Sequence, residues 1–516
     1  MKVVTADQMR RIDTIAIEQR DIPGTELMDR AGKTVTREIL ERFEPDSVAV
    51  VTGKGNNAGD GFVVARELER HGVTVRLYML RPAEELSGDA LDACGKVPDH
   101  LPRSIEPAPT ELREQLPQFD LVVDAMFGTG IKGSLRSPWD EYVEAINACR
   151  MNVVSIDIPS GMPSEGATGE EPTVHPVLTV TMGLPKLSMV MDPGLRSTGR
   201  VVVADIGFPD DLVNDPGITT NLVTLAMASE MLPPRPPNGH KGTFGRVLIL
   251  GGSEGMTGAA VMAAQAAARS GAGLVYSAYP QPLGGIMEGH LIEPVKLPLP
   301  GEARWFTPDH LEPALTAAES MDALAIGPGL GRRPDTARFL REILCRSDKP
   351  IVVDADGLNL LAEDFEDIMR HRPAATVLTP HPGEAARLLG CSVAEVQADR
   401  LGAFVEMARN QTVVTALKGS QTIITAPDGQ RFINPTGNTG LAKGGSGDIL
   451  TGLIAGLLAQ GSPALDATVL GTFMHGFAAD IVAETIDVRA MLPSEVLQAL
   501  GLAFKRIAGQ SVSPTT

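Results

Sequence analysis

Short apolar runs that end in glycine-rich or acidic turns recur along this chain, and each is followed by a segment with helical spacing. Residues 48–52 run into the loop 53–61, a helix is expected over residues 62–70, and residues 73–79 form the next apolar run. Residues 246–250 enter a second glycine-rich turn in the same way. Strand, loop and helix in this order make a βαβ unit, and repeated units build parallel sheets covered by helices on both faces. The pattern therefore predicts an α/β fold.

A change of character near residue 220 divides this pattern into two halves. Residues 208–224 lack strong periodicity, and residues 231–240 are dense in proline. With 516 residues, of which 43% are hydrophobic, the chain can build more than one core. We predict two layered α/β domains, residues 1–220 and residues 221–516. Further strands are expected at residues 119–124, 153–157, 177–182 and 200–205, and in the second half at residues 274–278, 321–326, 350–354, 376–379, 413–417 and 421–425.

Charge and cysteine usage exclude several classes of protein. The formal net charge is -19, whereas nucleic-acid and anionic-membrane surfaces need an excess of Lys and Arg. The four cysteines lie far apart, which predicts neither a zinc site nor a disulfide framework. The first residues become polar too early for a signal peptide, and no apolar run is long enough to span a bilayer. We expect a cytoplasmic protein that binds neither nucleic acid nor membrane.

The stretch from Asn438 to Leu450 combines a glycine-rich loop with the start of an apolar helix. Backbone N–H groups at such a junction bind anions, and the helix dipole adds positive potential. Asp448 follows the loop directly, and we expect the helix N-terminus to keep its carboxylate ionised. An anion pocket beside a base is what phosphoryl transfer to a hydroxyl requires. The structural alternative is a plain glycine turn with an Asp that complements the dipole.

Two predicted strands of the first half end in aspartate. Asp124 and Asp157 each precede a glycine-bearing turn, and the loop after residues 48–52 carries Asn57 and Asp60. Because carboxyl ends of parallel strands meet at one sheet edge, we expect these side chains to come together. Oxygen ligands alone suit a hard cation. The alternative for each Asp is that it caps the following helix.

The first glycine loop almost fits a dinucleotide-binding fingerprint. Gly53, Gly55 and Ala58 have the expected spacing, but Arg81 stands where such sites carry an acidic residue after the second strand. This departure disfavours a pyridine-nucleotide oxidoreductase.

Three polar residues of the second half are further candidates. Lys418 lies on a tight turn between two predicted strands, where a lysine can meet a phosphate as a point charge. His381 lies between two prolines, and Glu384 starts a helix. Their structural alternatives are an exposed hairpin lysine, a surface histidine and an acid that complements a helix dipole.

These motifs carry a resemblance to a known family over nearly the whole chain. Asn438 to Leu450, with residues 327–331 and 379–384, resembles the ribokinase-like dehydratase of nicotinamide-nucleotide repair. Residues 53–61, 124–134 and 157–161 resemble the epimerase that partners it. The chain as a whole is similar to the fused NAD(P)H-hydrate epimerase and ADP-dependent dehydratase. The resemblance implies a Rossmann-like three-layer sandwich over residues 1–220 and a ribokinase-like α/β domain over residues 221–516.

The same resemblance implies the reaction. The substrates would be the hydrates NADHX and NADPHX, whose R and S epimers the first domain interconverts. The second domain would dehydrate the S epimer at the expense of ADP, releasing AMP and phosphate, with Mg²⁺ on the nucleotide. It also implies K⁺ in the epimerase site and a homo-oligomer. A ribokinase-like ATP-dependent small-molecule kinase with a non-catalytic N-terminal nucleotide-binding domain is the alternative, and a first domain that serves only as a binding or scaffolding module is another.

Residue by residue, the resemblance assigns the following roles. Catalytic work falls to Asp157 and Asp448, and potassium binding to Asn57, Asp124 and Ser160. The hydrated dinucleotide would contact Asn56, Asn57, Ala58, Gly59, Asp60, Gly128, Thr129, Gly130, Ile131, Lys132, Gly133, Ser134 and Asp157 in the first domain, and Ala260, Gly329, His381, Gly383, Glu384 and Asp448 in the second. ADP would contact Lys418, Gly419, Ser420, Gln421, Thr422, Asn438, Thr439, Gly440, Leu441, Ala442, Lys443, Gly444, Gly445, Ser446 and Gly447.

One departure from the family concerns the epimerase loop. Ala58 stands where this loop usually has glycine. Its methyl group would press on a ligand cradled by backbone if its φ were positive.

Overall fold

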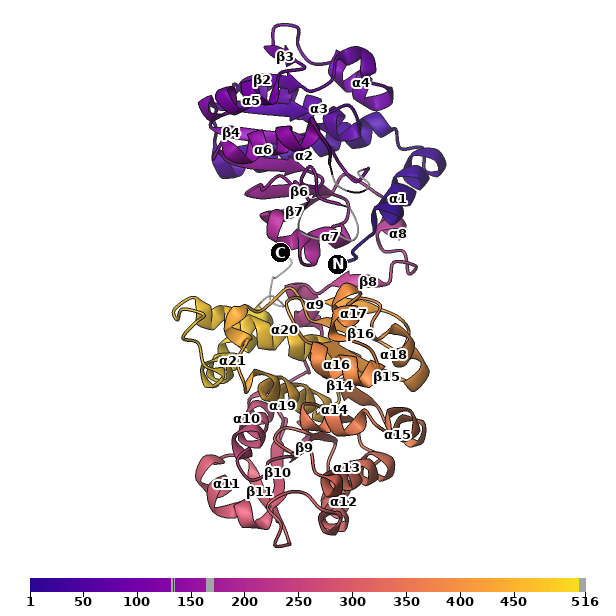
Figure 1. The fold of residues 1–516 in the computed structure, drawn as a ribbon, viewed down its shortest axis with the longest axis vertical. Coiled ribbons are helices and arrows are strands. Elements are labelled where there is room, and N and C mark those ends of the chain that lie inside the picture. Colours follow the sequence, from indigo (N-terminus) through magenta and orange to yellow (C-terminus); the bar gives the residue numbers. More distant parts are fainter. Residues whose placement is uncertain (131–132, 134, 164–170, 510–516) are drawn as a thin grey trace. The chain divides into compact units, whose positions relative to one another are not determined.

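The computed structural model describes residues 1–130, 133, 135–163 and 171–509, and the chain divides into two compact units, Met1–Thr220 and Asn221–Thr516 (Figure 1). Each unit is built around one sheet with helices on both faces. None of the described helices is long and apolar enough to cross a bilayer.

The sheet of the first unit has seven parallel strands in the order β3-β2-β1-β4-β5-β6-β7. The strands are β1 (Ser47–Thr52), β2 (Thr74–Met79), β3 (Arg103–Ile105), β4 (Leu121–Ala125), β5 (Asn152–Ile156), β6 (Leu178–Met182) and β7 (Arg200–Ala204). The helices are α1 (Ala6–Gln19), α2 (Gly24–Phe43), α3 (Asn56–Arg70), α4 (Gly88–Gly95), α5 (Pro109–Gln115), α6 (Trp139–Ala148), α7 (Leu187–Val190) and α8 (Asp210–Val213).

Alternation along β1 explains the three layers of this unit. Val48 and Val50 belong to one buried core, which they share with α2 and α3. Ala49 and Val51 belong to the opposite core, which they share with α5 and α6. Because successive side chains of a strand point to opposite faces, a run that is apolar throughout must be covered on both sides. The predicted Rossmann-like three-layer sandwich is confirmed.

The sheet of the second unit has ten strands in the order β11-β10-β9-β12-β13-β14-β15-β16-β17-β8. They are β8 (Thr220–Leu222), β9 (Arg246–Leu250), β10 (Leu274–Pro280), β11 (Val295–Leu299), β12 (Ala323–Ile326), β13 (Ile351–Val353), β14 (Thr376–Leu378), β15 (Val413–Leu417), β16 (Ile423–Thr425) and β17 (Arg431–Ile433). The pairs from β11 to β15 are parallel, whereas β15, β16 and β17 pair antiparallel, as the predicted hairpin around Lys418 requires.

The helices of the second unit form the outer two layers. They are α9 (Leu225–Glu230), α10 (Thr257–Arg269), α11 (Gly284–His290), α12 (Leu311–Glu319), α13 (Pro334–Arg346), α14 (Asp356–Leu361), α15 (Phe365–His371), α16 (Pro382–Leu389), α17 (Val393–Ala398), α18 (Val405–Gln411), α19 (Ser446–Ala459), α20 (Ala464–Ala483) and α21 (Pro493–Ala508). One core holds alternate residues of β9 with α10, α19, α20 and α21, and the other holds the remaining β9 residues with α12 to α15.

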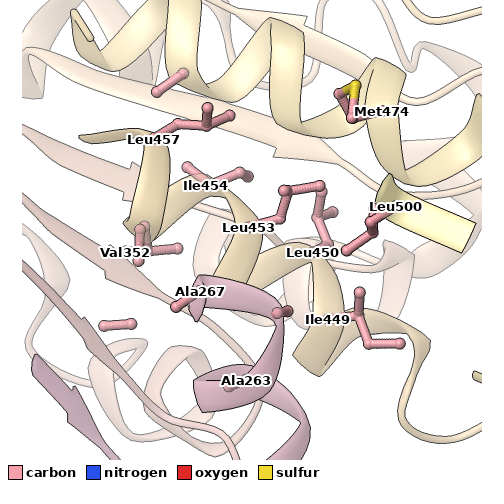
Figure 2. Close-up of a cluster of buried hydrophobic side chains, with 14 of the residues drawn as sticks. Ala263, Ala267, Val352, Ile449, Leu450, Leu453, Ile454, Leu457, Met474 and Leu500 are labelled. Atoms are coloured by element: carbon pink, nitrogen blue, oxygen red, sulfur yellow. The ribbon is translucent and has the colours of Figure 1, made fainter. Parts of the chain in front are cut away.

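Close packing between α10 and α19 fixes the start of α19. Figure 2 shows Ala263 and Ala267 of α10 beside the apolar side chains of α19. A Cβ atom at Gly452 would lie 1.9 Å from the carbonyl oxygen of Ala263, and one at Gly456 would lie 2.0 Å from Ser270 Oγ. Only glycine allows this approach of two helix backbones. The glycine-rich loop that precedes α19 is therefore held against a rigid helix pair.

The structure corrects the predicted start of α3. The helix begins at Asn56, not at Phe62, because the Gly55 carbonyl accepts the N–H groups of Ala58 and Gly59 at 2.9 and 3.3 Å. The glycines of residues 56–61 allow this helix to pack closely against its neighbours, where we expected a loop. A Cβ atom at Gly61 would lie 2.6 Å from Ala125 Cβ, so α3 rests directly on β4.

Candidate active sites

A cavity of about 610 Å³ opens at the carboxyl ends of β1, β4 and β5 in the first unit. Seven of the residues predicted for the first site line it, namely Asn56, Asn57, Asp60, Gly128, Thr129, Gly130 and Asp157. They come from the start of α3, from the turn after β4 and from the turn after β5. Parallel strands thus bring together residues that lie up to a hundred positions apart, as expected for this fold.

Asp157 is held in place by a buried lysine. Its backbone has a φ of +65°, and its Oδ1 accepts bonds from Thr181 Oγ1 and the Met182 N–H, both at 3.3 Å. Lys186 forms an ion pair with the same carboxylate and is fully buried. The ammonium also donates to Thr181 Oγ1 at 2.8 Å and to the Met182 carbonyl at 3.1 Å. An ammonium has three N–H bonds, and all three are used here.

Three more carboxyl groups line this cavity, those of Asp13 in α1, Asp60 in α3 and Asp89 in α4, and no ion pair reaches any of them among the described residues. Burial raises the pKa of Asp13 to about 6, and the negative charge of Asp157 adds to the rise while Lys186 opposes it. Burial raises the pKa of Asp60 well above its ordinary value, and Asp157 and Asp13 add to this shift.

Beside the cavity lies a cluster of oxygen atoms around Asp124. The buried carboxylate accepts Ser160 Oγ at 2.6 Å, the Ser160 N–H at 2.9 Å and Ser155 Oγ at 2.8 Å. Burial raises the pKa of Asp124, and these hydrogen bonds oppose the shift. Asn57 Nδ2 donates to the Phe127 carbonyl at 2.9 Å, whereas Asn57 Oδ1 is buried without a partner among the described residues.

The remaining predictions for this site fall outside the cavity or outside the described residues. Ala58 and Gly59 are buried within α3. Ala58 has a helical backbone, so the positive φ that would press its methyl group on a ligand does not occur. Gly133 is exposed, with a φ of +75°. Ile131, Lys132 and Ser134 lie outside the described residues.

The second site is organised around a lysine and an aspartate. Lys418 Nζ lies 2.7 Å from Asp354 Oδ1 and 3.8 Å from Glu384 Oε2. The other oxygen of Asp354 accepts Thr451 Oγ1 at 2.6 Å. A Cβ atom at Gly447 would lie 3.3 Å from Lys418 Nζ, so the glycine-rich loop passes directly beside the ammonium. Lys418 is thus a fixed charge next to the predicted anion loop. The alternative interpretation, an exposed hairpin lysine, is wrong.

Asp448 differs from our expectation in its ionisation. Burial raises the pKa of Asp448 to about 7, and the negative charges of Asp354 and Asp356 add to the rise while Lys418 opposes it. The helix N-terminus alone would lower this pKa. In this site desolvation and neighbouring carboxylates outweigh the dipole. Asp448 therefore changes its charge near neutral pH, where a general base is most effective.

The loop before α19 is braced by its own side chains. Asn438 donates to Asp480 Oδ1 at 3.0 Å and accepts the Gly440 N–H at 3.0 Å. Lys443 donates to the carbonyl oxygens of Arg489 and Met491 at 2.8 and 2.5 Å. Residues Thr439–Leu441 form a 3₁₀ turn, and Gly445 has a φ of +102°. In the part of the chain that the structure describes, no neighbouring atom lies within 4 Å of the Cβ position of Gly444, so this part of the loop is open.

The other predicted residues of the second site occupy defined positions. Nδ1 of His381 accepts the N–H groups of Gly383 and Glu384 at 3.0 and 3.3 Å, which caps α16. Gly329 is buried, with a φ of +63°, and a Cβ atom there would lie 2.3 Å from the Met256 carbonyl oxygen. Ala260 is fully buried within α10.

The backbone of the β15–β16 turn is tied to an arginine. Arg400 donates to the carbonyl oxygens of Ser420 and Gln421 at 2.6 and 3.2 Å. Gly419 and Ser420 are exposed, whereas Thr422 is half-buried. Lys418 enters the site from the first position of this turn.

Sequence reasoning missed several residues of both sites. Asp354 ends a buried strand as Asp124 and Asp157 do, so the same argument could have found it. Lys186 and Asp13 had no such signal, because a tertiary fold brings them to the cavity. His475 of α20 is buried near the anion loop, and burial together with the positive charge of Lys418 lowers its pKa to about 4.

Comparison with known proteins identifies relatives of both units. A family model described as NAD(P)H-hydrate dehydratase matches residues 247–501, and one described as YjeF-related protein N-terminus matches residues 24–188. A bifunctional NAD(P)H-hydrate repair enzyme of Moorella thermoacetica is 41% identical over 516 residues, which cover 98% of this chain and 97% of that protein.

Two solved structures resemble the second unit. A ribokinase-like superfamily protein of Enterococcus faecalis is 26% identical with a TM-score of 0.50, covering 56% of this chain and 97% of its own. An ADP/ATP-dependent NAD(P)H-hydrate dehydratase of Bacillus subtilis, co-crystallised with ATP and Mg²⁺, is 32% identical with a TM-score of 0.48, covering 56% and 98%. Because the relative from Moorella is similar along its whole length, and a family model matches each unit, this chain belongs to the family of bifunctional NAD(P)H-hydrate repair enzymes.

Proposed function

We propose that this chain repairs hydrated NADH and NADPH in two steps, one in each unit. The first unit interconverts the R and S epimers of the hydrate. The second unit dehydrates the S epimer with ADP and releases AMP and phosphate. The observation that carries the proposal is Asp448, a base with a pKa of about 7 at the start of α19, directly after an anion loop and beside the Lys418 ammonium.

The dehydration step needs a better leaving group than hydroxide. Asp448 takes the proton of the hydroxyl as its oxygen attacks the β-phosphorus of ADP, and the bond between the β-phosphorus and its bridging oxygen breaks to release AMP. Phosphate then leaves as its C–O bond breaks, and the neighbouring ring carbon gives up a proton to water, which restores the dihydronicotinamide ring. We assign the nucleotide to residues 418–422 and 438–447, and the hydrate to Gly329, His381, Gly383, Glu384 and Asp448. Ala260 supports this site from beneath the turn at Gly251 and Gly252, where Cβ atoms would lie 3.3 and 3.4 Å from its methyl group.

Mg²⁺ fits the second site as a companion of the nucleotide. This ion takes most of its ligands from phosphate and water, so it needs few protein oxygens. Asp354 is buried, and its Oδ2 lies 3.5 Å from the Cβ position of Gly447 in the loop. We propose that Asp354 and Glu384 face the hydrated ion. When bound, Mg²⁺ offsets the negative charge of the phosphate oxygens.

The first unit would hold the hydrate in the cavity described above. We assign substrate contacts to the predicted residues that line it, with Asp157 as acid or base, and extend the site through residues 131–134. We propose K⁺ at Asn57, Asp124 and Ser160. The buried Asn57 Oδ1 supports this assignment, because it has no partner among the described residues. An amide oxygen, a hydroxyl and a carboxylate together are a donor set for a hard cation.

One assay tests the proposal. The separated R and S hydrates are supplied with ADP or with ATP, and the return of dihydronicotinamide absorbance is followed. Recovery from both epimers is the expected result. No recovery with either nucleotide would refute the repair function and favour a small-molecule kinase. Recovery from the S epimer alone would leave the first unit as a binding module.

A further inference from the structure

Three aspartates, Asp13, Asp60 and Asp157, line the cavity of the first unit together with Lys186, which is its buried cation. These four residues come from four separate places in the fold: α1, the first half of α3, the turn after β5 and the turn after β6. The exposed Arg10 and Lys54 and the half-buried Asp89 also line it. Asp13 lies before residue 24, where the family-model match begins.

The single buried ammonium is committed to one of the three carboxylates. Lys186 pairs with Asp157, and its other two N–H groups go to Thr181 Oγ1 and the Met182 carbonyl. Among the described residues, no hydrogen bond or ion pair reaches the carboxyl group of Asp13 or Asp60. Within that same part of the chain, no three His, Cys, Asp or Glu side chains converge closely enough to hold a metal ion. The carboxyl groups therefore surround the cavity without sharing one ion.

Asp157 and Asp60 consequently occupy opposite electrostatic environments. Asp157 is held by the Lys186 ammonium and by two further hydrogen-bond donors, the Thr181 hydroxyl and the Met182 N–H. Asp60 is penalised by burial and faces the negative charges of Asp157 and Asp13, and only Lys186 opposes them. Arg10, Lys54 and Asp89 also line the cavity. A carboxylate held by an ammonium beside a carboxyl group that has no partner can supply a base and an acid in one site.

We propose that Asp60 is the acid and Asp157 the base of the epimerisation, on the two sides of the bound ring. This inference rests on the proposed epimerase function and names the groups that carry it out. Asp13 acts through Asp60, as a positioning residue whose charge favours the protonated state of its neighbour.

The chemistry balances in protons and electrons. The hydroxyl-bearing carbon of the hydrate lies next to the ring nitrogen, because water adds to an enamine at the carbon that can become an iminium. Asp60 gives its proton to the hydroxyl, the C–O bond breaks, and water leaves while the nitrogen lone pair forms a C=N⁺ bond. A water molecule then attacks the opposite face, and Asp157 takes its proton. One proton has passed from Asp60 to Asp157, and exchange with solvent restores the starting state.

The first test replaces Asp60 by asparagine in the full chain. Asp60→Asn keeps the size and polarity of the side chain but carries no acidic proton. We expect epimer interconversion, corrected for the uncatalysed rate, to fall about 100-fold or more, as is usual for loss of a general acid. The KM for the hydrate should change little. Asp92→Asn, at an exposed aspartate of α4 that pairs with Lys96, is the matched control and should remain fully active.

Dehydration of the S epimer by the same preparation shows that the second unit is folded, and an unchanged KM for the hydrate in the epimerisation assay shows the same for the first unit. Near-normal epimerisation by Asp60→Asn would overturn the inference and leave the proposed function intact. A wild-type chain that cannot interconvert the epimers would instead refute the proposed function itself.

The second test measures how the epimerisation rate of the Asp13→Asn variant depends on pH, and it does not require the Asp60 variant. Epimerisation should decline at high pH as Asp60 loses its proton. Removal of the Asp13 charge lowers the pKa of Asp60, so this alkaline decline should move to lower pH while the rate below it persists. An alkaline decline at the same pH as in the wild type would contradict the roles given to Asp13 and to Asp60.

Discussion

At the residue scale, the two sites share one arrangement, a lysine–aspartate ion pair with a second aspartate nearby. Each pairs a lysine with an aspartate at the end of a strand, the buried Lys186 with Asp157 and the half-buried Lys418 with Asp354. Each then places another aspartate nearby, Asp60 in one site and Asp448 in the other, whose pKa is raised by burial and by the paired aspartate. The ion pair is a fixed feature, and the neighbouring carboxyl group is the one whose pKa is raised, to about 7 for Asp448.

Asp448→Asn tests the base of the dehydratase. The variant should still bind nucleotide, because the loop and Lys418 are untouched, but turnover of the S epimer should fall about 10² to 10⁴-fold. In the wild type, a base with a pKa of about 7 must lose its proton to act, so kcat should fall as pH drops below 7 and level off above it. Turnover near the wild-type level, or a flat profile between pH 6 and 8, would show that another group is the base.

Lys186→Met tests the buried ion pair as a structural element. The substitution leaves the Asp157 carboxylate partly buried without its partner, which costs about 3 to 5 kcal/mol in comparable pairs. Urea unfolding of the full chain should report this loss. Arg338→Met breaks an exposed pair with Asp335, whose side chains are 69% and 45% exposed, and should cost less than about 1 kcal/mol. Equal effects for the two variants would show that Lys186 is not essential to the fold.

At the element scale, most strands could be predicted from the sequence, whereas the structural roles of several glycines could not. Strands such as β9 and β15 have the expected bounds, because their apolar runs are covered on both faces. The edge strands β3, β8 and β11 were missed, and so was β17 next to β8, since short or half-exposed strands lack that signal. Gly59 and Gly61 suggested a loop but serve helix packing in α3. The anion loop was found because its glycines and Asp448 follow one another in sequence, whereas Asp13 and Lys186 are brought to their site only by tertiary folding.

Gly452→Ala tests whether α10 and α19 must touch. Alanine favours a helix over glycine by about 1 kcal/mol, but its Cβ atom here would lie 1.9 Å from a backbone oxygen of α10. We expect a net loss of about 1 to 3 kcal/mol and a displaced anion loop with reduced dehydration, while epimerisation persists. Gly501→Ala in α21 meets nothing within 4 Å and should leave stability unchanged or raise it by up to about 1 kcal/mol. A stabilised, fully active Gly452→Ala variant would contradict the packing argument.

At the scale of the whole molecule, each unit contains a complete sheet, its own cores and its own candidate site. The R epimer must be handled by the first unit before the second can use it, so repair of that epimer depends on both. The S epimer is the intermediate that connects the two reactions.

A mixture of two variants, each lacking one of the two activities, tests whether the S epimer can pass from one molecule to another. With the R epimer and ADP, Asp448→Asn alone should yield the S epimer but no dihydronicotinamide. Asp157→Asn alone should be limited to the slow uncatalysed epimerisation. A mixture of the two variants should recover dihydronicotinamide, because each supplies the site that the other lacks, and the rate should rise with the concentration of either one. If the mixture stays as slow as Asp157→Asn alone while the wild type is fast, the intermediate does not reach a second molecule, and the two sites act as one.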